Sequence, residues 1–147
     1  MIWGFTGTRT GMSGPQATEL LVELTSPFTY VAPEEIAYLE IAYFHHGDCV
    51  GSDYLAACMA DKVGWITVAH PPLNDKYRAH HASNIILDKD TYLGRDEAIV
   101  RAAEKMIATP RNYYPVARSG TWATIRYAQK IGKPVLIIFP DGRKELR

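Results

Sequence analysis

The chain has 147 residues, of which 47% are hydrophobic and 22% charged, as expected of one domain (residues 1–147) with its own core. Its 16 basic residues balance its 16 acidic ones, which argues against general nucleic-acid binding because that function needs a basic surface. No apolar stretch is long enough to span a bilayer, and no leader precedes the first apolar run at residue 2. We therefore expect a cytoplasmic protein without a signal peptide.

The first predicted unit is a strand at residues 2–6 followed by a helix. Ser13-Gly14-Pro15-Gln16 has the pattern of a capping box, with serine at the N-cap, proline in the first turn and glutamine three residues after the serine. Pro33-Glu34-Glu35 predicts the start of a second, short helix, since acidic residues suit a first turn. The spacing of the apolar residues predicts a buried face on the first helix that consists of Ala17, Leu20, Leu21 and Leu24.

The second unit consists of a strand at about 41–45 and a helix at about 52–63, which Gly64 ends. The predicted buried face of this helix consists of Leu55, Ala56, Met59 and Val63. A third strand at 65–69 leads into a long polar loop at 70–93. Because loops of this length are uncommon in compact domains, we expect it to be a lid or ligand-binding loop, anchored by Ile85-Ile86-Leu87.

The remaining elements are a helix at 94–104, a strand at 105–109, a helix at 120–131 and a strand at 135–139. The last strand is apolar throughout, which is typical of a strand covered on both faces. The regular alternation predicts a Rossmann-like α/β domain, with three layers (α/β/α) and a mainly parallel sheet of about five strands. Ligands of such sheets bind at the carboxyl ends of the strands.

Glycine-containing polar turns follow three of these strands, and each turn precedes a helix. Glycine lets the main chain approach a ligand closely, and the first amides of a helix are unpaired donors that favour an anion. The turns therefore predict a crevice that binds phosphate. The predicted ligand-binding residues are Gly7, Thr8, Arg9, Gly47, Asp48, Gly51, Ser52, Asp53, His70, Arg118, Ser119, Gly120 and Thr121.

Individual residues of the crevice have different expected partners. Arg9 and Arg118 suit phosphate, whereas Asp48 would repel it and is expected to bind a ribose hydroxyl or a base amine. His70, at the end of a strand, would donate to the ligand. A structural role is the alternative throughout: the turns would be tight connections, and the serines and aspartates at the helix starts would be caps. Trp122 would stack on a base or, more simply, belong to the core.

The histidines and cysteines do not indicate a metal or a disulfide. His45, His46, His70, His80 and His81 show none of the familiar ligand spacings, so we expect no metal and no resident cofactor. Cys49 and Cys58 are expected to be free thiols. Ser52, Ser119 and Cys49 open helices, where a nucleophile is favoured, but none lies in a Gly-x-Ser-x-Gly elbow. No carboxylate is identifiable by spacing as the third member of a catalytic triad, so the sequence does not indicate a hydrolase triad.

Taken in order, these motifs resemble the SLOG superfamily. That group includes the Rossmann-like LOG phosphoribohydrolases, the DNA-processing DprA proteins and small nucleotide-sensing relatives, of which the YspA-like proteins are the nearest in pattern. The resemblance covers about residues 2–140. The matching segments are Thr6-Gly7-Thr8-Arg9, the turn from His46 to Asp53, His70-Pro71, Arg95-Asp96, Gly120-Thr121 and Gly132-Lys133-Pro134.

The resemblance implies a homodimer that binds a nucleotide or a nucleotide-derived ligand, such as an ADP-ribose-like molecule or a sugar nucleotide. It also bears on catalysis. Arg95 matches an arginine with which LOG enzymes hydrolyse an N-glycosidic bond, whereas their glutamate position falls on Thr124, and Ala117 and Arg118 replace two glycines of their motif. The leading hypothesis is therefore a protein that senses or sequesters its ligand.

Two alternatives remain. The first is an enzyme, either a nucleoside-monophosphate N-glycosidase or a deoxyribosyltransferase-like protein. Its catalytic pair would be Arg95 and Asp96, with Asp48 and Asp53 as other candidate carboxylates. The second alternative is a structural or interaction module, which would have the same fold without a positively charged crevice.

Overall fold

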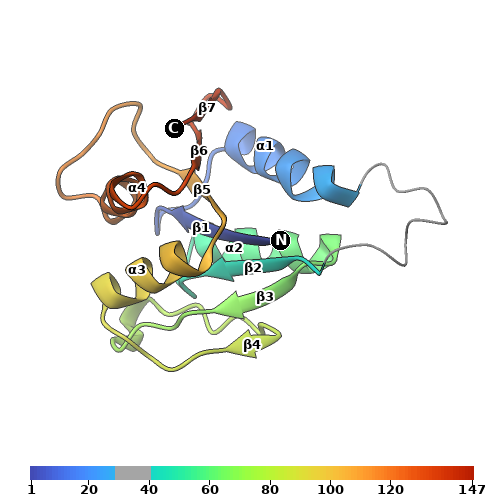
Figure 1. Ribbon diagram of the computed structural model, residues 1–147, viewed down its shortest axis with the longest axis vertical. Coiled ribbons are helices and arrows are strands. Elements are labelled where there is room, and N and C mark those ends of the chain that lie inside the picture. Colours follow the sequence, from blue (N-terminus) through green and yellow to red (C-terminus); the bar gives the residue numbers. More distant parts are fainter. Residues whose placement is uncertain (29–40) are drawn as a thin grey trace.

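The computed structural model describes residues 1–28 and 41–147, in which helices surround a central sheet (Figure 1). The predicted helix start at Pro33-Glu34-Glu35 lies outside the described residues. The elements, with η for 3-10 turns, are β1 (Ile2–Gly7), α1 (Gly14–Thr25), η1 (Ser26–Phe28), β2 (Tyr43–His46), α2 (Ser52–Val63), β3 (Ile66–Ala69), η3 (Asp75–Tyr77), β4 (Ile85–Ile86), α3 (Tyr92–Ala102), β5 (Lys105–Thr109), α4 (Gly120–Lys130), β6 (Val135–Ile138) and β7 (Lys144–Leu146).

The sheet confirms the Rossmann-like prediction, with a different strand count. Within the described residues it has seven strands, in the order β4-β3-β2-β1-β5-β6-β7, rather than about five. Neighbouring strands are parallel except for β6 and β7. Because β2 and β3 lie on one side of β1 and β5 lies on the other, the strand order reverses at β1. The carboxyl ends of β1, β2 and β5 therefore meet where ligands bind in such sheets.

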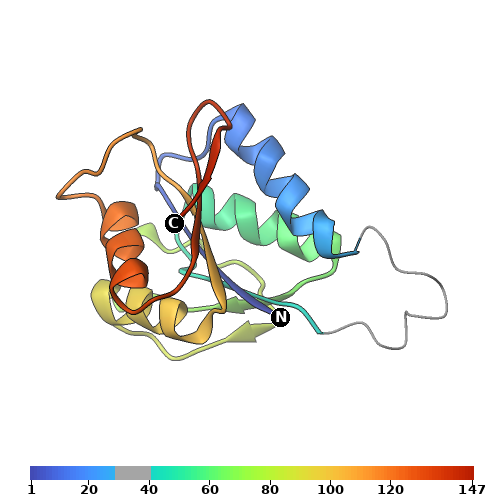
Figure 2. The same cartoon turned by 45° about the horizontal axis from the view of Figure 1, so that its top comes forward.

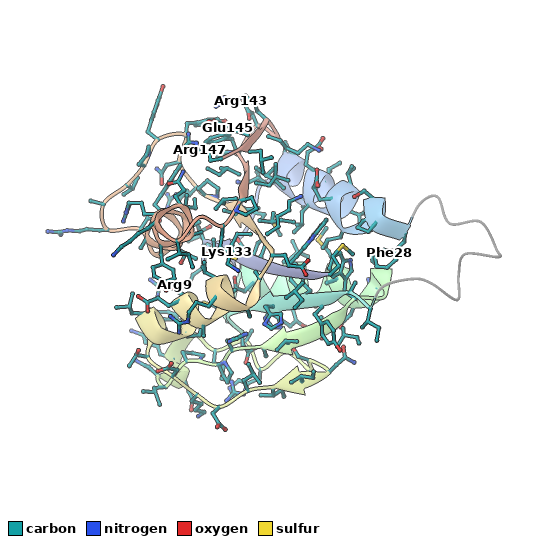
Figure 3. All side chains as sticks on the ribbon, viewed as in Figure 1. Arg9, Phe28, Lys133, Arg143, Glu145 and Arg147 are labelled. Atoms are coloured by element: carbon teal, nitrogen blue, oxygen red, sulfur yellow. The ribbon has the colours of Figure 1, made fainter. Side chains whose placement is uncertain are left out.

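The two strands beyond the prediction are short edge strands with weak sequence signals. β4 has only two residues and lies in the segment predicted to anchor the long loop. β7 follows a turn in which the Gly142 amide donates to the Phe139 carbonyl, so the chain reverses and pairs with β6. Glu145 of β7 and its flanking residues Arg143 and Arg147 are labelled at this edge in Figure 3. Charged residues are common on edge strands, which is why the segment did not resemble a strand.

Two helices cover each face of the sheet. In Figures 1 and 2, α1 and α2 lie on one side and α3 and α4 on the other. The side chains of the strands alternate between the two cores: Ile107 packs with Leu20, Leu24 and Ala56 on the first side, whereas Met106 packs with Ile99 and Ile125 on the second. This is the predicted three-layer α/β/α arrangement, and it leaves the carboxyl edge of the sheet uncovered.

Small residues, rather than the predicted large ones, form part of the helix contacts. Leu21 of α1 and Leu55 of α2 are exposed, contrary to prediction, while Ala57 and Ala60 of α2 are fully buried. A small residue lets the helix axis approach the sheet closely, so the helix turns its alanines inward. Helix α3 begins at Tyr92, two residues earlier than predicted, because the Thr91 hydroxyl accepts a hydrogen bond from the Gly94 amide and caps it.

Gln16 connects α1 to the carboxyl edge of the sheet. The capping box forms as predicted, since Ser13 and Gln16 exchange hydrogen bonds at the start of α1. The buried Gln16 amide also donates from Nε2 to the carbonyl of Pro110 at 2.7 Å and to that of Ile138 at 2.9 Å. These carbonyls follow β5 and end β6, so one side chain ties three elements together.

We predict that Gln16→Leu lowers the free energy of unfolding by about 2–4 kcal/mol, because it removes part of a capping box and leaves two buried carbonyls without their donor. Ser13 remains the N-cap in this variant, so what is lost is the Gln16 half of the capping box and the two donated bonds. The measurement is urea unfolding followed by circular dichroism. Gln129→Leu is the matched control, since Gln129 is exposed on α4 and should change stability little. Equal effects of the two substitutions would contradict this role of Gln16.

Candidate functional site: a cavity at the carboxyl edge of the sheet

A cavity of about 540 Å³ lies at the carboxyl ends of β1 and β5, between the first turns of α3 and α4. This volume suits a small-molecule ligand. Its walls come from the three predicted turns, from α3 and from the loop after β5. The lining residues are Phe5, Thr6, Gly7, Thr8, Arg9, Thr10, Gly47, Cys49, Asp53, Tyr92, Arg95, Asp96, Ile99, Arg111, Asn112, Arg118, Ser119, Gly120 and Thr121.

The first and second turns touch through their main chains. Both the amide and the hydroxyl of Ser52 donate to the Thr8 carbonyl, at 3.1 and 2.7 Å. Gly51 makes this approach possible: its φ is +86°, and a Cβ there would lie 2.1 Å from the Arg9 carbonyl oxygen. No other residue type fits this position without moving the first turn. The turns are therefore held in register by backbone contacts.

Arg95 of α3 reaches the second turn and organises the cavity floor. Its guanidinium donates through Nη1 to the Gly47 carbonyl, and its Nε lies 2.7 Å from Oδ1 of Asp96. Gly47 in turn donates its amide to Oδ2 of Asp53 at 3.0 Å. A Cβ at Gly47 would lie 2.7 Å from Arg95 Nη1, so glycine is again what permits the contact. The buried guanidinium is thus fixed between main chain and carboxylate.

Burial shifts the titration of the acidic groups in the cavity. Desolvation raises the pKa of Asp53 to about 7, although the Arg95 charge and amide donors from Cys49 and Gly47 favour its ionised form. Burial likewise raises the pKa of Asp96, against the opposing effect of Arg95. Burial and the Asp53 charge raise the pKa of Cys49 to about 11, so this residue presents a neutral thiol to the cavity at neutral pH.

The third turn presents the amino-terminal end of α4. Ser119 is its N-cap and accepts a hydrogen bond from the Trp122 amide, as the structural alternative predicted, and it also lines the cavity together with Gly120 and Thr121. Amides at a helix start favour an anion. Thr124, at the position of the LOG glutamate, is buried, and its hydroxyl donates to the Gly120 carbonyl at 3.0 Å.

The arginines on the cavity walls are Arg9, Arg95, Arg111 and Arg118, from four separate segments. Arg9, labelled in Figure 3, shares the cavity lining with residues of α3 and α4, and its guanidinium stacks 3.9 Å from the centre of the Tyr77 ring in the long loop. Sequence analysis did not identify Arg111, Asn112 or Tyr92. The sequence did contain a signal for Arg111 and Asn112: they follow β5 within three residues, and polar residues just after a parallel strand lie at the carboxyl edge of the sheet, where ligands bind.

The structure places most of the predicted site residues together. Those that line the cavity are Gly7, Thr8, Arg9, Gly47, Asp53, Arg95, Asp96, Arg118, Ser119, Gly120 and Thr121. Asp48, Gly51, Ser52 and His70 are not among the lining residues, and each has a partner within the protein. Gly51 and Ser52 support the contact between the turns.

Asp48 and His70 have their partners outside the cavity. The Asp48 carboxylate pairs with Nε of Arg78 at 2.9 Å and accepts the His81 amide at 2.9 Å. The Nε2 atom of His70 lies 2.8 Å from Nδ1 of His45, and burial lowers the pKa of His70 to about 4. Neither residue lines the cavity: Asp48 holds the long loop against the second turn, whereas His70, directly after β3, pairs with His45 of β2.

Several other residues named in the sequence lie in or around the cavity. Trp122 is buried in the core and does not line the cavity, so the structural alternative holds for it. Tyr113 stacks on Phe139, whereas Tyr114 is exposed. Cys49 and Cys58 are free thiols.

Residues 1–28 and 41–147 contain no group of three or more His, Cys, Asp or Glu side chains arranged to hold a metal ion. The same residues include no helix with the length and apolar character needed to cross a membrane.

The same fold occurs in proteins that bind the molybdenum cofactor. The molybdenum cofactor binding protein of Rippkaea orientalis matches 94% of this chain and 76% of its own, with a TM-score of 0.66 and 20% identity. The Moco carrier protein of Chlamydomonas reinhardtii matches 92% of this chain and 74% of its own, with a TM-score of 0.63 and 18% identity. No family model and no curated protein matches the sequence.

At these identities the likeness establishes the fold alone. The neighbours share the Rossmann-like fold that the sequence predicted, and membership of the SLOG superfamily stays a hypothesis. The narrower resemblance to the YspA-like proteins stays a hypothesis.

Proposed function

We propose that this protein binds a nucleotide-like anion, a phosphate-bearing ring compound, in the cavity at the carboxyl edge of its sheet. The observation that carries the proposal is the convergence of Arg9, Arg95, Arg111 and Arg118 on one cavity that three glycine-containing turns line. Guanidinium groups and helix amides are the donors that phosphate prefers. A module without a ligand would have no reason to gather this charge there.

The cavity also suits the rest of such a ligand. Tyr92 offers an aromatic face on the wall, and buried carboxyl groups at Asp53 and Asp96 can accept hydrogen bonds from ring nitrogens or ribose hydroxyls. Two structural neighbours bind or carry the molybdenum cofactor, a small molecule. This likeness supports the ligand class and leaves its identity to experiment. The protein would sense, carry or sequester the ligand in the cytoplasm, as a homodimer.

The first test is titration calorimetry with ADP-ribose, nucleoside mono- and diphosphates, and inorganic phosphate. We predict that Arg118→Ala weakens binding of the best ligand about tenfold, because it removes an exposed charge-assisted contact to phosphate. Arg101→Ala is the matched control: Arg101 is an exposed arginine of α3 outside the cavity, and its loss should leave affinity unchanged.

Mass spectrometry of small molecules released from the denatured protein supplements the titration. It identifies a ligand that co-purifies and would otherwise block the titration. The proposal fails if the folded protein releases no anionic ring compound and binds nothing across the panel.

Anion affinity should also depend on pH through Asp53. Its pKa of about 7 means that the carboxyl gains a negative charge as the pH rises from about 6 to about 8. That charge lies on the cavity wall and repels an anion, so we predict affinity for ADP-ribose to fall roughly threefold to tenfold over this range. ADP-ribose is the suitable probe because its phosphates do not titrate there. The Asp53→Asn variant should lose the dependence, and an unchanged slope in this variant would refute the assignment.

A second candidate function is hydrolysis of an N-glycosidic bond. The observation in its favour is that Arg95 and Asp96 form an ion pair on the cavity wall, beside the amino-terminal end of α4 that carries Thr124. A carboxylate from α3 would thus occupy the neighbourhood of Thr124, where the LOG enzymes carry a glutamate. Asp96 could stabilise positive charge at the anomeric carbon while Arg95 holds the phosphate.

Chromatographic detection of free base from a nucleoside monophosphate separates the enzyme from the sensor. If the protein is an enzyme, we predict that Arg95→Ala abolishes base release. We also predict that Asp96→Asn slows release by at least about 100-fold, because it removes a charge used in the transition state, while nucleotide binding persists. A wild-type protein that binds nucleotide and releases no base is a binding protein only.

A further inference from the structure

A continuous chain of hydrogen bonds joins α2, the long loop and β2, away from the cavity lining. Oδ2 of Asp61 lies 2.8 Å from Nε2 of His81, and Nδ1 of His81 lies 2.7 Å from the Ser83 hydroxyl. The same hydroxyl lies 2.8 Å from Nε2 of His46. The proposed ligand cavity does not include any of these residues. An acid, an imidazole and a hydroxyl in this order have the geometry of an activated nucleophile, which is recognised by contacts rather than by sequence position.

The direction of every proton in the chain follows from one backbone donor. The Asp48 amide donates to Nδ1 of His46 at 3.1 Å, so His46 carries its proton on Nε2 and donates it to the Ser83 hydroxyl oxygen. The Ser83 proton is then directed at Nδ1 of His81. His81 therefore carries its own proton on Nε2, facing the Asp61 carboxylate.

The surroundings hold these groups in place. His46 and His81 are buried, and the Asp61 carboxylate also accepts the Thr67 hydroxyl at 3.0 Å. Burial, reinforced by the charge of His81 and other neighbours, lowers the pKa of His46 to about 3, so this imidazole stays neutral and keeps its donor role. Ser83 is only partly buried, so this residue is the most exposed of the three on the β2 side of the chain, where His46 and His81 are buried.

An apolar hollow of about 210 Å³ lies next to this chain. Its walls are Val50, Gly51, Tyr54 and Ala79, and the ring of Tyr54 packs edge-on against the ring of His81 with 5.9 Å between centres. Tyr54 thus belongs to both the hollow and the surroundings of the base. The hollow has room for a short apolar group, such as the acyl part of a small ester.

We propose that Ser83 is a nucleophile that takes an acyl group from small activated esters, with His81 as its base and Asp61 as the group that orients His81. As the oxygen–carbonyl carbon bond forms, the hydroxyl proton passes to Nδ1 of His81. The negative charge of the tetrahedral intermediate develops on the carbonyl oxygen of the ester, while the His46 N–H, hydrogen-bonded to the serine oxygen, holds that oxygen in position for the attack. Collapse of the tetrahedral intermediate breaks the ester bond, and the leaving alcohol takes the proton from His81. Water then hydrolyses the acyl-serine by the same route and restores the free hydroxyl.

The direct experiment treats the folded wild-type protein with a fluorophosphonate, which phosphonylates activated serines with loss of fluoride. Intact-mass analysis and peptide mapping then locate the adduct. We expect one adduct, on Ser83, and hydrolysis of 4-nitrophenyl acetate that the adduct abolishes. Ser83→Ala should lose both. Ser26→Ala, at an exposed serine after α1, should keep both.

Asp61→Asn distinguishes an activated serine from one that only supports the loop. This variant retains the Ser83 hydroxyl and should slow labelling by on the order of 100-fold, because the base loses its orienting charge. Circular dichroism and ADP-ribose titration report whether each variant is folded, and ligand binding in the cavity is not expected to change. The inference is overturned if folded wild-type protein carries no adduct on Ser83, or if Asp61→Asn labels as fast as wild type.

Discussion

The close approach of two main-chain turns is the constraint on which the cavity depends. The turn after β1 and the turn after β2 meet where the Thr8 carbonyl accepts two hydrogen bonds from Ser52, and Gly51 lies against the Arg9 carbonyl. The parallel pairing of β1 and β2 brings the two turns close together, and the absence of a side chain at Gly51 lets their main chains touch. A side chain at Gly51 would separate the turns and open the floor, whatever the ligand.

The charge in the cavity is arranged differently at the floor and at the rim. Arg95 is buried, donates to the Gly47 carbonyl and pairs with Asp96, so its guanidinium is held in place before any ligand arrives. Arg111 and Arg118 are exposed at the rim, where their charges can attract an anionic ligand from solution. Buried pairs of this kind position groups more than they add affinity, whereas the rim arginines supply attraction at the cost of sensitivity to salt. The floor therefore fixes geometry and the rim attracts the anion.

Local patterns predicted the elements and most of the cavity, because glycine turns, caps and apolar runs are encoded within a few residues. The capping box at Ser13, the stop at Gly64 and the turn at Ser119 are of this kind. The predictions that failed depend on contacts between residues far apart in the sequence. β7 forms only because β6 offers it an edge, and Leu55 is exposed because alanines bring α2 closer to the sheet. Asp48 has the sequence position of a ligand contact, yet Arg78, thirty residues later, takes its carboxylate. No spacing rule could reveal that pairing.

Asp48 shows how one turn can serve two sites. Its φ is +50°, which turns its side chain away from the cavity that Gly47 and Asp53 line. On that opposite side its amide sets the proton on His46, and its carboxylate holds the His81 amide. The tautomers of the histidine chain are thus fixed by the same segment that shapes the cavity floor. These two contacts of Asp48 involve the main-chain amides of Asp48 and His81 rather than any side chain that lines the cavity. Substitution of a cavity side chain therefore leaves them in place, and the two sites can be tested separately.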